Sequence, residues 1–249
     1  MTERLKGKRI IITGAANNIG KEVARSFVAE GAKVVIGDID AALGAGTAEE
    51  LGASFLQVDV SDEKSVSQFV DAAVQQLGGL DVLVQNAGLQ RVGKVTELAV
   101  SDWDAVFAVN ARGHFLGAKF AVPHLRKSGK GSIINTSSLA GKRGGPGVTA
   151  YSASKGAVIA FSTALALELA PDNIRVNSIC PGWVDTAFNN PAIGIMGGRA
   201  SQEEAVRRIV PLQRQAQPQE MAGLFVYLAS DESSYMTAQS VVIDGGVYN

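Results

Sequence analysis

The sequence contains little of the residue types that build disulfides and metal sites. Its 249 residues include one cysteine, Cys180, and two histidines. One cysteine cannot close an intramolecular disulfide, and no cysteine or histidine lies near it in sequence to complete a metal site. The sequence therefore predicts no bound metal and indicates a reducing compartment, which we expect to be the cytoplasm.

The sequence also lacks an excess of charge of either sign. Its 23 basic and 24 acidic side chains give a formal net charge of −1, and they form no runs. This balance gives no electrostatic reason to expect nucleic acid or an anionic membrane as a partner. The first residues, MTERLKGKRI, lack the apolar core of a secretory signal, and no window reaches about 18 uninterrupted apolar residues. We therefore expect a small-molecule substrate and no membrane partner.

Short apolar runs alternate with longer helical stretches along the whole chain. Such runs suit parallel strands that helices cover on both faces. The strands are expected at 9–13, 33–38, 54–60, 81–86, 132–138, 174–180 and 240–246. The helices are expected at about 19–30, 41–50, 62–78, 101–127, 150–170, 202–210 and 218–230. The pattern predicts a single α/β domain over residues 1–249, with a Rossmann-like doubly wound parallel sheet of seven strands.

A glycine-containing turn, TGAANNIG at 13–20, joins the first strand to the first helix. The free N–H groups and the dipole of a helix N-terminus can hold a pyrophosphate. An ordinary strand-to-helix turn would show the same glycine spacing, so the turn alone is weak evidence. The candidate cofactor residues in this turn are Gly14, Asn17, Asn18, Ile19 and Gly20.

The second strand ends in Asp38, close to the offset at which an acidic residue meets the adenosine ribose. A carboxylate there accepts hydrogen bonds from ribose hydroxyls and repels a 2′-phosphate. No Lys or Arg in the segment GDIDAAL compensates its charge, so NAD is favoured over NADP. The alternative is that Asp38 only caps a helix or a turn.

Other strand ends should meet at the same edge of the sheet, where open α/β sheets bind ligands. They supply Asp59 with Val60, and Asn86 with Ala87 and Gly88. Turn chemistry alone could also explain these residues. The following segment, GLQRVGKV at 88–95, is a near-match to a triphosphate-binding loop, but Val95 stands where a magnesium-binding hydroxyl is required.

Tyr151 and Lys155 lie four residues apart in a long apolar segment that is expected to be helical. Residues at this spacing share a helix face. An ammonium about 4 Å from a phenolate attracts it by about 4 kcal/mol at an effective dielectric near 20. We therefore expect Lys155 to lower the pKa of Tyr151 by up to about three units, which would suit Tyr151 to proton transfer with an alcohol or a carbonyl.

Two polar residues could complete this pair. Ser138, at the end of a strand, could orient the substrate oxygen, and Asn110 could hold a water that links Lys155 to solvent. Each residue alone has an ordinary explanation, such as a core aromatic, a solvated charge, a turn serine or a helix-bending amide.

Together these residues resemble the short-chain dehydrogenase/reductase family over essentially the whole chain. The resemblance is carried by TGAANNIG, Asp59, QNAG at 85–88, Asn110, Ser138, YSASK at 151–155 and PGWVDT at 181–186. It implies an NAD-dependent enzyme with a tetrad of Asn110, Ser138, Tyr151 and Lys155, in which Lys155 also binds the nicotinamide ribose. It further implies that Pro181, Gly182, Val184 and Thr186 hold the nicotinamide, that residues from about 186 to 210 cover the substrate, and that the protein is a homotetramer.

Three positions in the cofactor turn and the QNAG segment bear on this resemblance. Asn18 stands where the family usually has a glycine, and asparagine tolerates left-handed backbone better than other residues with a side chain. Gln85 replaces the first asparagine of the usual NNAG and keeps an amide. Asn17 occupies a position that is often basic in NADP-preferring relatives, which supports the interpretation of Asp38.

The hypothesis is a hydride transfer between NAD(H) and a secondary alcohol or ketone. An NADPH-dependent reductase of 3-oxoacyl thioesters and an inactive dinucleotide-binding regulatory protein are the alternatives. A serine hydrolase is disfavoured because the chain has no Gly-x-Ser-x-Gly. The segment 189–199 is expected to be a mobile loop. Nearby, Phe188, Ile193, Ile195 and Met196 suggest an apolar substrate wall, and Arg199 could instead bind an anion.

Overall fold

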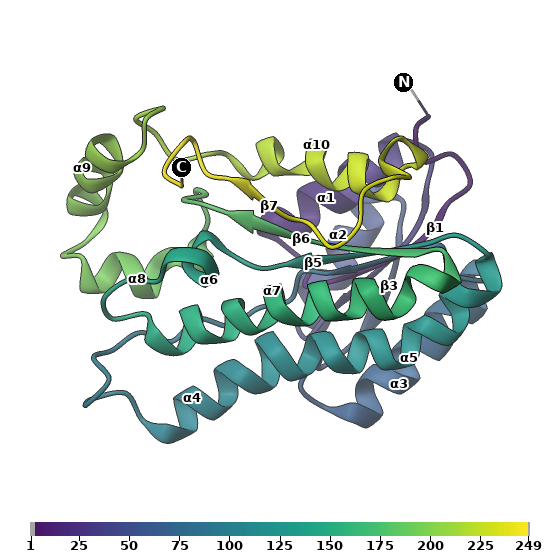
Figure 1. Ribbon diagram of the computed structural model, residues 1–249, viewed down its shortest axis with the longest axis horizontal. Helices are drawn as coiled ribbons and strands as arrows, with labels where there is room; N and C mark the ends of the chain where they lie inside the picture. The colour runs from purple at the N-terminus through teal and green to yellow at the C-terminus, as the bar shows by residue number, and fades with distance from the viewer. Residues whose placement is uncertain (1–2, 249) are drawn as a thin grey trace.

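Seven parallel strands form one sheet in the order β3-β2-β1-β4-β5-β6-β7 (Figure 1). The structure is a computed structural model that describes residues 3–248. The strands are β1 Arg9–Thr13, β2 Lys33–Asp38, β3 Ser54–Gln57, β4 Val82–Gln85, β5 Gly131–Thr136, β6 Ile174–Pro181 and β7 Ser240–Ile243. The predicted fold class is confirmed.

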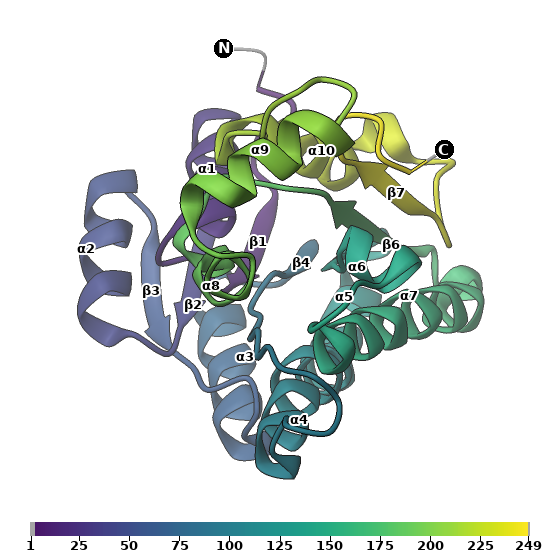
Figure 2. The same ribbon diagram turned by 90° about the vertical axis from the view of Figure 1, so that its left-hand side faces the viewer.

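Helices cover both faces of this sheet. They are α1 Asn18–Ala29, α2 Ala41–Leu51, α3 Glu63–Leu77, α4 Val100–Phe107, α5 Gly113–Ser128, α6 Leu139–Arg143, α7 Thr149–Leu169, α8 Asn190–Ile195, α9 Arg199–Ile209 and α10 Pro218–Ala229. Figures 1 and 2 show α1, α2 and α10 on one face, and α3, α4, α5 and α7 on the other.

Strand β1 shows why the apolar runs are continuous. Successive side chains of a strand point to opposite faces. Ile10 and Ile12 belong to the core under α1 and α10, whereas Ile11 belongs to the core under α3, α5 and α7. All three are fully buried, and burying an isoleucine side chain contributes about 1.5–3 kcal/mol. Both faces of a central strand must therefore be apolar.

The long helix that the sequence predicts over 101–127 is interrupted. A π-helical turn, Ala108–Arg112, separates α4 from α5 and contains the buried residue Asn110. Such turns widen the backbone hydrogen-bond pattern by one residue and occur often at functional sites. The apolar periodicity continues across the turn, which is why the sequence pattern did not reveal it.

The segment 189–199, which was expected to be a mobile loop, is largely helical. Helix α8 occupies Asn190–Ile195, and α9 begins at Arg199. Pro191 lies in the first turn of α8, where its missing N–H costs nothing. Ala192 and Ile193 are buried, so tertiary packing stabilises a helix too short to show periodicity in the sequence.

The segment Thr149–Asp172, which begins with α7, is long and apolar enough to cross a membrane on length and composition alone. In the structure Ala166 and Leu169 pack in the core beneath the sheet. The same helix buries the polar residues Ser154, Lys155 and Ser162. These contacts are those of the core helix of a globular fold.

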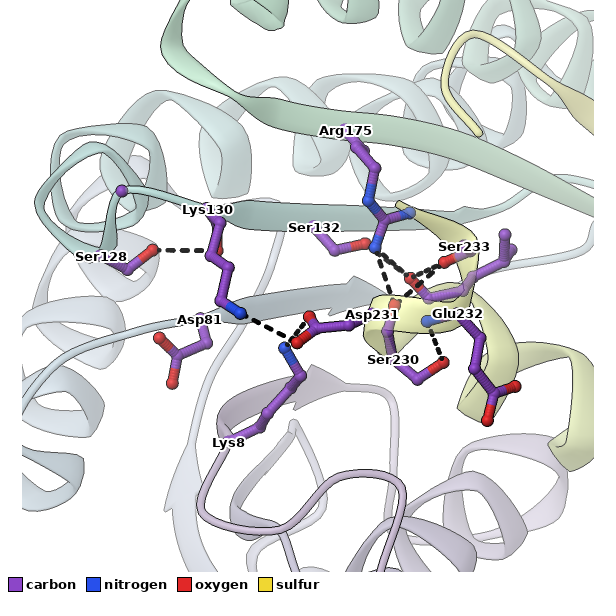
Figure 3. A network of polar contacts seen from close by, with 12 residues as sticks. Lys8, Asp81, Ser128, Lys130, Ser132, Arg175, Ser230, Asp231, Glu232 and Ser233 are labelled. Carbon is purple, nitrogen blue, oxygen red and sulfur yellow. Dashed lines mark hydrogen bonds and ion pairs between the residues drawn. The ribbon is translucent and has the colours of Figure 1, made fainter. Parts of the chain in front are cut away.

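Ionic contacts join the chain at the amino ends of the strands (Figure 3). The carboxylate of Asp231 lies 2.7 Å from Lys8 Nζ and 2.8 Å from Lys130 Nζ, just before β1 and β5. These contacts, Lys130 first, lower the pKa of Asp231 to about 2. Nearby, Arg175 Nη2 donates to the carbonyls of Leu228 (2.9 Å) and Ser230 (3.3 Å) at the end of α10. The charged side chains of Lys8, Lys130 and Asp231 are therefore paired with one another, and Arg175 is paired with backbone carbonyls.

Candidate active site

A cavity of about 970 Å³ lies at the opposite edge, beyond the carboxyl ends of the strands. Helices α6, α8 and α9 lie at this edge, on the left of Figure 1 and toward the viewer in Figure 2. The residues that line the cavity include nearly all the predicted cofactor residues: Gly14, Asn17, Asn18, Ile19, Asp38, Asp59, Val60, Asn86, Ala87, Gly88, Tyr151, Lys155, Pro181, Gly182, Val184 and Thr186. A cavity of this size suits a cofactor and a small substrate together.

The turn after β1 is packed too tightly to admit side chains at its glycines. Gly14 has a φ of +65°, and a Cβ there would lie 2.5 Å from Ala87 Cα. Gly20 is not among the lining residues that the structure describes. A Cβ on Gly20 would collide with the carbonyl of Gly14. Because Gly20 has no side chain, the turn can pack closely against the start of α1. The N-terminus of α1 is then left open to a ligand.

Two asparagines hold this turn in place. Asn18 adopts a φ of +50°, the left-handed conformation that its position predicts. Asn86 Nδ2 donates to the carbonyl of Gly14 at 2.8 Å, which fastens the turn after β1 to the end of β4. This shape fits a dinucleotide, whose pyrophosphate would lie against the N-terminus of α1.

Asp38 lies at one end of the cavity. Its Oδ2 accepts a hydrogen bond from Ala16 N at 3.0 Å, and its Oδ1 accepts one from Asp40 N at 3.2 Å. Among the lining residues of the described chain, the cations are Arg143 and Lys155, which lie on α6 and α7. The structure thus gives the carboxylate of Asp38 hydrogen-bond donors and no lysine or arginine.

Asp59 lies at the same side of the cavity, after β3. Its Oδ1 accepts hydrogen bonds from the backbone N–H of Ser61 at 2.8 Å and from its hydroxyl at 2.7 Å. The turn chemistry considered for this residue is therefore present, and Asp59 still lines the cavity. Contact between Asp59 and an adenine stays a prediction.

Tyr151 and Lys155 lie on α7 and line the cavity together with Ser138. Both side chains are nearly buried, with exposed fractions of 8% and 2%. Lys155 Nζ donates to the carbonyl of Thr136 at 2.8 Å and lies 5.8 Å from the centre of the Tyr151 ring. Ser138 caps α6 by accepting from Ala140 N at 3.1 Å. The three predicted side chains therefore line the same cavity, and Tyr151 contacts Ser138.

The expectation that Lys155 lowers the pKa of Tyr151 is wrong for this structure. Burial raises the pKa of the phenol to about 12, and a hydrogen bond with Ser138 lowers it only in part. Burial also lowers the pKa of Lys155 to about 8. Burial disfavours the charged form of each group, and the Lys155 ammonium donates its hydrogen bond to the Thr136 carbonyl. A neutral phenol is a proton donor, and alcohol oxidation requires its ionisation.

Asn110 lies behind this group and is fully buried. Its Oδ1 accepts from Leu89 N at 2.7 Å, and its Nδ2 donates to the carbonyl of Leu89 and to Ser154 Oγ, each at 2.9 Å. The side chain thus fixes the segment after β4 against α7. A water linking Asn110 to Lys155 stays a prediction.

Several residues of the site escaped sequence reasoning. A Cβ on Gly141 would lie 2.6 Å from the backbone of Lys155, so this glycine lets α6 approach α7. Gln90 and Val148 also line the cavity. No short motif marks these residues, because their roles depend on contacts between distant segments.

Gln85 has a structural role behind the cavity. Its Nε2 donates to the carbonyl of His114 at 3.0 Å and to Asn135 Oδ1 at 2.9 Å. A Cβ on Gly117 would collide with Gln85 Oε1. The larger amide is therefore accommodated by a glycine on α5.

The residues after β6 form the remaining wall. Phe188, Ile195 and Met196 line the cavity as expected, and the Phe188 ring lies 5.9 Å from that of Tyr151. Ile193 is buried but is not among the described lining residues. Arg199 is bound to Asp185 at 2.6 Å and Glu203 at 3.2 Å. Its guanidinium is therefore held by the protein's own carboxylates, so the idea that it binds an anion is not favoured.

Comparisons with known proteins agree with this geometry. A protein-family model described as "Enoyl-(Acyl carrier protein) reductase" matches residues 14–248. The 3-oxoacyl-[acyl-carrier-protein] reductase of Thermotoga maritima is 41% identical over 98% of this chain and 99% of that protein. A 3-alpha-(or 20-beta)-hydroxysteroid dehydrogenase of Mycobacterium bovis is also 41% identical, over 99% of this chain and 91% of that protein.

The fold has a solved counterpart as well. The crystal structure of a short-chain type dehydrogenase/reductase from Mycobacterium marinum matches with a TM-score of 0.91 and 35% identity, covering 99% of this chain and 97% of that one. Proteins of this family are oxidoreductases that use nicotinamide dinucleotides, NAD or NADP. With the sequence match over residues 14–248, the chain belongs to the short-chain dehydrogenase/reductase family.

Proposed function

We propose that the protein transfers a hydride between NAD(H) and a secondary alcohol or ketone, with Tyr151 as the general acid and base. The observation that carries the proposal is a cavity whose lining includes Asp38, at the end of β2, together with Ser138 after β5 and Tyr151 and Lys155 on α7. A nicotinamide bound beside Tyr151 would supply or accept the hydride.

The residues of the catalytic end have separate tasks in this proposal. Tyr151 donates its proton to the carbonyl oxygen during reduction and takes the hydroxyl proton during oxidation. Ser138 hydrogen-bonds the same substrate oxygen. Lys155, whose ammonium donates to the carbonyl of Thr136 beside the cavity, binds the nicotinamide ribose.

NAD is proposed as the cofactor because of Asp38. Its carboxylate would accept hydrogen bonds from the ribose hydroxyls and would repel a 2′-phosphate. An NADPH-dependent reductase of 3-oxoacyl thioesters is the second candidate, and the Thermotoga maritima relative favours it. Fluorescence titration with NADH and NADPH separates the two: we expect tighter binding of NADH, and a clear preference for NADPH would support the second candidate.

The activity itself is tested with a panel of secondary alcohols and NAD⁺, read as NADH absorbance. We expect turnover of uncharged, medium-sized alcohols, because the substrate wall includes Phe188, Ile195 and Met196. Inactivity across the panel despite NADH binding would contradict the proposal and favour a regulatory dinucleotide-binding protein.

We also propose a cytoplasmic homotetramer built on α4, α5 and α7. Support for the assembly comes from large apolar side chains exposed on these helices, such as Trp103, Phe115 and Leu167. Gel filtration should give about four times the chain mass of 25.9 kDa, and a single monomeric species would contradict the assembly.

A further inference from the structure

The segment that follows β7, residues 244–248, lies beside the cavity. Val247 of this segment is half-buried and lines the cavity. Its neighbour Tyr248 is 47% exposed and is not among the lining residues described for the cavity. Within the 244–248 segment, Val247 is therefore the residue that a ligand in the cavity can reach.

Asp244 fixes the shape of the 244–248 segment. Its Oδ1 accepts from Gly246 N at 2.9 Å and from Val247 N at 3.2 Å, and its Oδ2 accepts from Tyr248 N at 2.8 Å. A Cβ on Gly182, which lines the cavity after β6, would lie 2.6 Å from Asp244 Cβ. One carboxylate thus holds the segment as a tight turn against the end of β6.

The 244–248 segment also contacts two other parts of the cavity wall. On one side, Leu212 N donates to the carbonyl of Gly245 at 3.3 Å, and a Cβ on Gly245 would lie 2.7 Å from Val210. On the other side, Arg143 Nη1, at the end of α6, donates to the carbonyl of Val247 at 3.4 Å. The segment therefore joins the residues that follow α9 to the end of α6.

The backbone of Val247 is already bound, which leaves its side chain for a ligand. Its N–H donates to Asp244, and its carbonyl accepts from Arg143. Ile195 and Ile209 also line the cavity and are 52% and 44% exposed, so they mark its mouth. A valine side chain is apolar and stiff at χ1. Val247 thus adds a rigid apolar group to the wall near α6 and the end of α9.

We propose that Val247 is a specificity-determining residue that limits the size of the substrate, and that Asp244 positions it. This inference rests on the proposed function. Tyr151 is 8% exposed, so the reacting carbon lies deep in the cavity, and the substituent that points from it toward the mouth contacts Val247. The segment is held on three sides and cannot retreat from a bulky group. The favoured substrates are therefore uncharged secondary alcohols and ketones with a compact apolar substituent.

The test compares kcat/KM for the smallest and the largest secondary alcohols that the wild type oxidises. Val247→Ala should raise the large-to-small ratio by about fivefold to tenfold, and Val247→Phe should lower it by about tenfold. Both shifts should come mainly from KM, because a wall contacts the bound alcohol and the transition state alike. Asp244→Ala, which frees the segment, should move the ratio in the same direction as Val247→Ala.

Val242→Ala is the matched control, because Val242 lies half-buried on β7 and is not among the lining residues described for the cavity. It should change the ratio by less than about twofold. Val247→Leu replaces Val247→Phe if the phenylalanine variant folds poorly, with a smaller decrease expected.

Opposite shifts in the small and large variants of Val247 are what a merely structural role would not give. A ratio that stays within about twofold in both variants, or that moves in the same direction in both, would overturn this inference alone. An unchanged ratio in Asp244→Ala would overturn the positioning role of Asp244. Inactivity of the wild type on every alcohol of the panel would overturn the proposed function, and this inference with it.

Discussion

The edge of the sheet where the strands begin, the amino edge, and the edge where they end, the carboxyl edge, use polar residues in opposite ways. At the amino edge, Asp231 pairs with Lys8 and Lys130, and Arg9 pairs with Asp81 at 2.8 Å. At the carboxyl edge, Asp38 faces no cation of the described lining, and Gln90 keeps an unpaired oxygen. Charges that are paired with an opposite charge within the fold serve its stability, whereas a carboxylate that lines a cavity without a facing cation, such as Asp38, is available to a ligand.

The same contrast separates the lysines. Lys8 and Lys130 each contact a carboxylate. Lys155 is buried with a carbonyl as its hydrogen-bond partner, and burial lowers its pKa to about 8. A buried ammonium without an anion is costly, so Lys155 should reduce stability at the site where it supports activity. Variants at the two edges should therefore affect different measurements.

The largest effect is expected for Lys155→Met, which should lower kcat by about a thousandfold and raise the free energy of unfolding. The folded pKa lies below the ordinary value of 10.5, so the wild-type protein carries this penalty fully below about pH 8 and loses it as the pH rises toward 10.5. The gain near pH 7 should be about 1–3 kcal/mol, since the hydrogen bond to Thr136 is also lost.

Urea unfolding of both proteins near pH 7 and near pH 10 measures this difference. A Lys155→Met variant that is less stable than the wild type near pH 7 would contradict the claim that Lys155 reduces stability, and with it the contrast with Lys8 and Lys130.

Asp38→Ser should have the next largest effect, on cofactor choice. Removal of the carboxylate takes away the acceptor for the ribose hydroxyls and the repulsion of a 2′-phosphate. The ratio of NADPH to NADH affinity should rise by about tenfold or more. Asp40→Ala is the control, because Asp40 accepts from Leu43 N and caps α2; it should cost about 1 kcal/mol of stability and leave the ratio near its original value.

Asp231→Asn tests the amino edge and should change stability without changing kcat. The Asp231 side chain is 61% exposed, so solvent screening limits the loss to less than about 1 kcal/mol. Its folded pKa is lowered to about 2 from 3.8, so this stability is present above about pH 4 and is lost as the pH falls through 2. Chemical unfolding above about pH 4 and near pH 2 measures whether the stability that Asp231 contributes is lost in acid. A fall in kcat would contradict a purely structural role for Asp231.

Arg199→Ala should have the smallest effect. It removes the ion pairs with Asp185 and Glu203 beside the substrate wall, and exposed pairs of this kind contribute little to stability. We expect an unchanged melting temperature, an unchanged kcat and a KM that rises no more than about fivefold. A large loss of kcat would mean that Arg199 acts on the substrate itself.

The parts of the fold that depend on local pattern could be predicted from the sequence. Ile10, Ile11 and Ile12 are apolar because both faces of β1 are buried, and this produces the continuous runs. The predicted cofactor turn was recognisable because Gly14 and Gly20 are required by close backbone approach.

The parts that depend on distant contacts could not be predicted. The π-helical turn at Asn110 and the short helix α8 are stabilised by packing rather than by periodicity. Burial raises the pKa of the Tyr151 phenol, and the helical spacing of Tyr151 and Lys155 does not show this burial, so the spacing gave the wrong direction. Gln90 lines the cavity although it belongs to no short motif.

The most direct test of the central claim is a single turnover of NADH with a ketone by the wild type and Tyr151→Phe. The variant keeps the ring that packs near Phe188 and loses only the proton donor. We expect hydride transfer to slow by at least about a thousandfold, while the NADH dissociation constant changes by less than about threefold. A variant that retains more than a tenth of the wild-type rate with normal NADH binding would contradict the role of Tyr151.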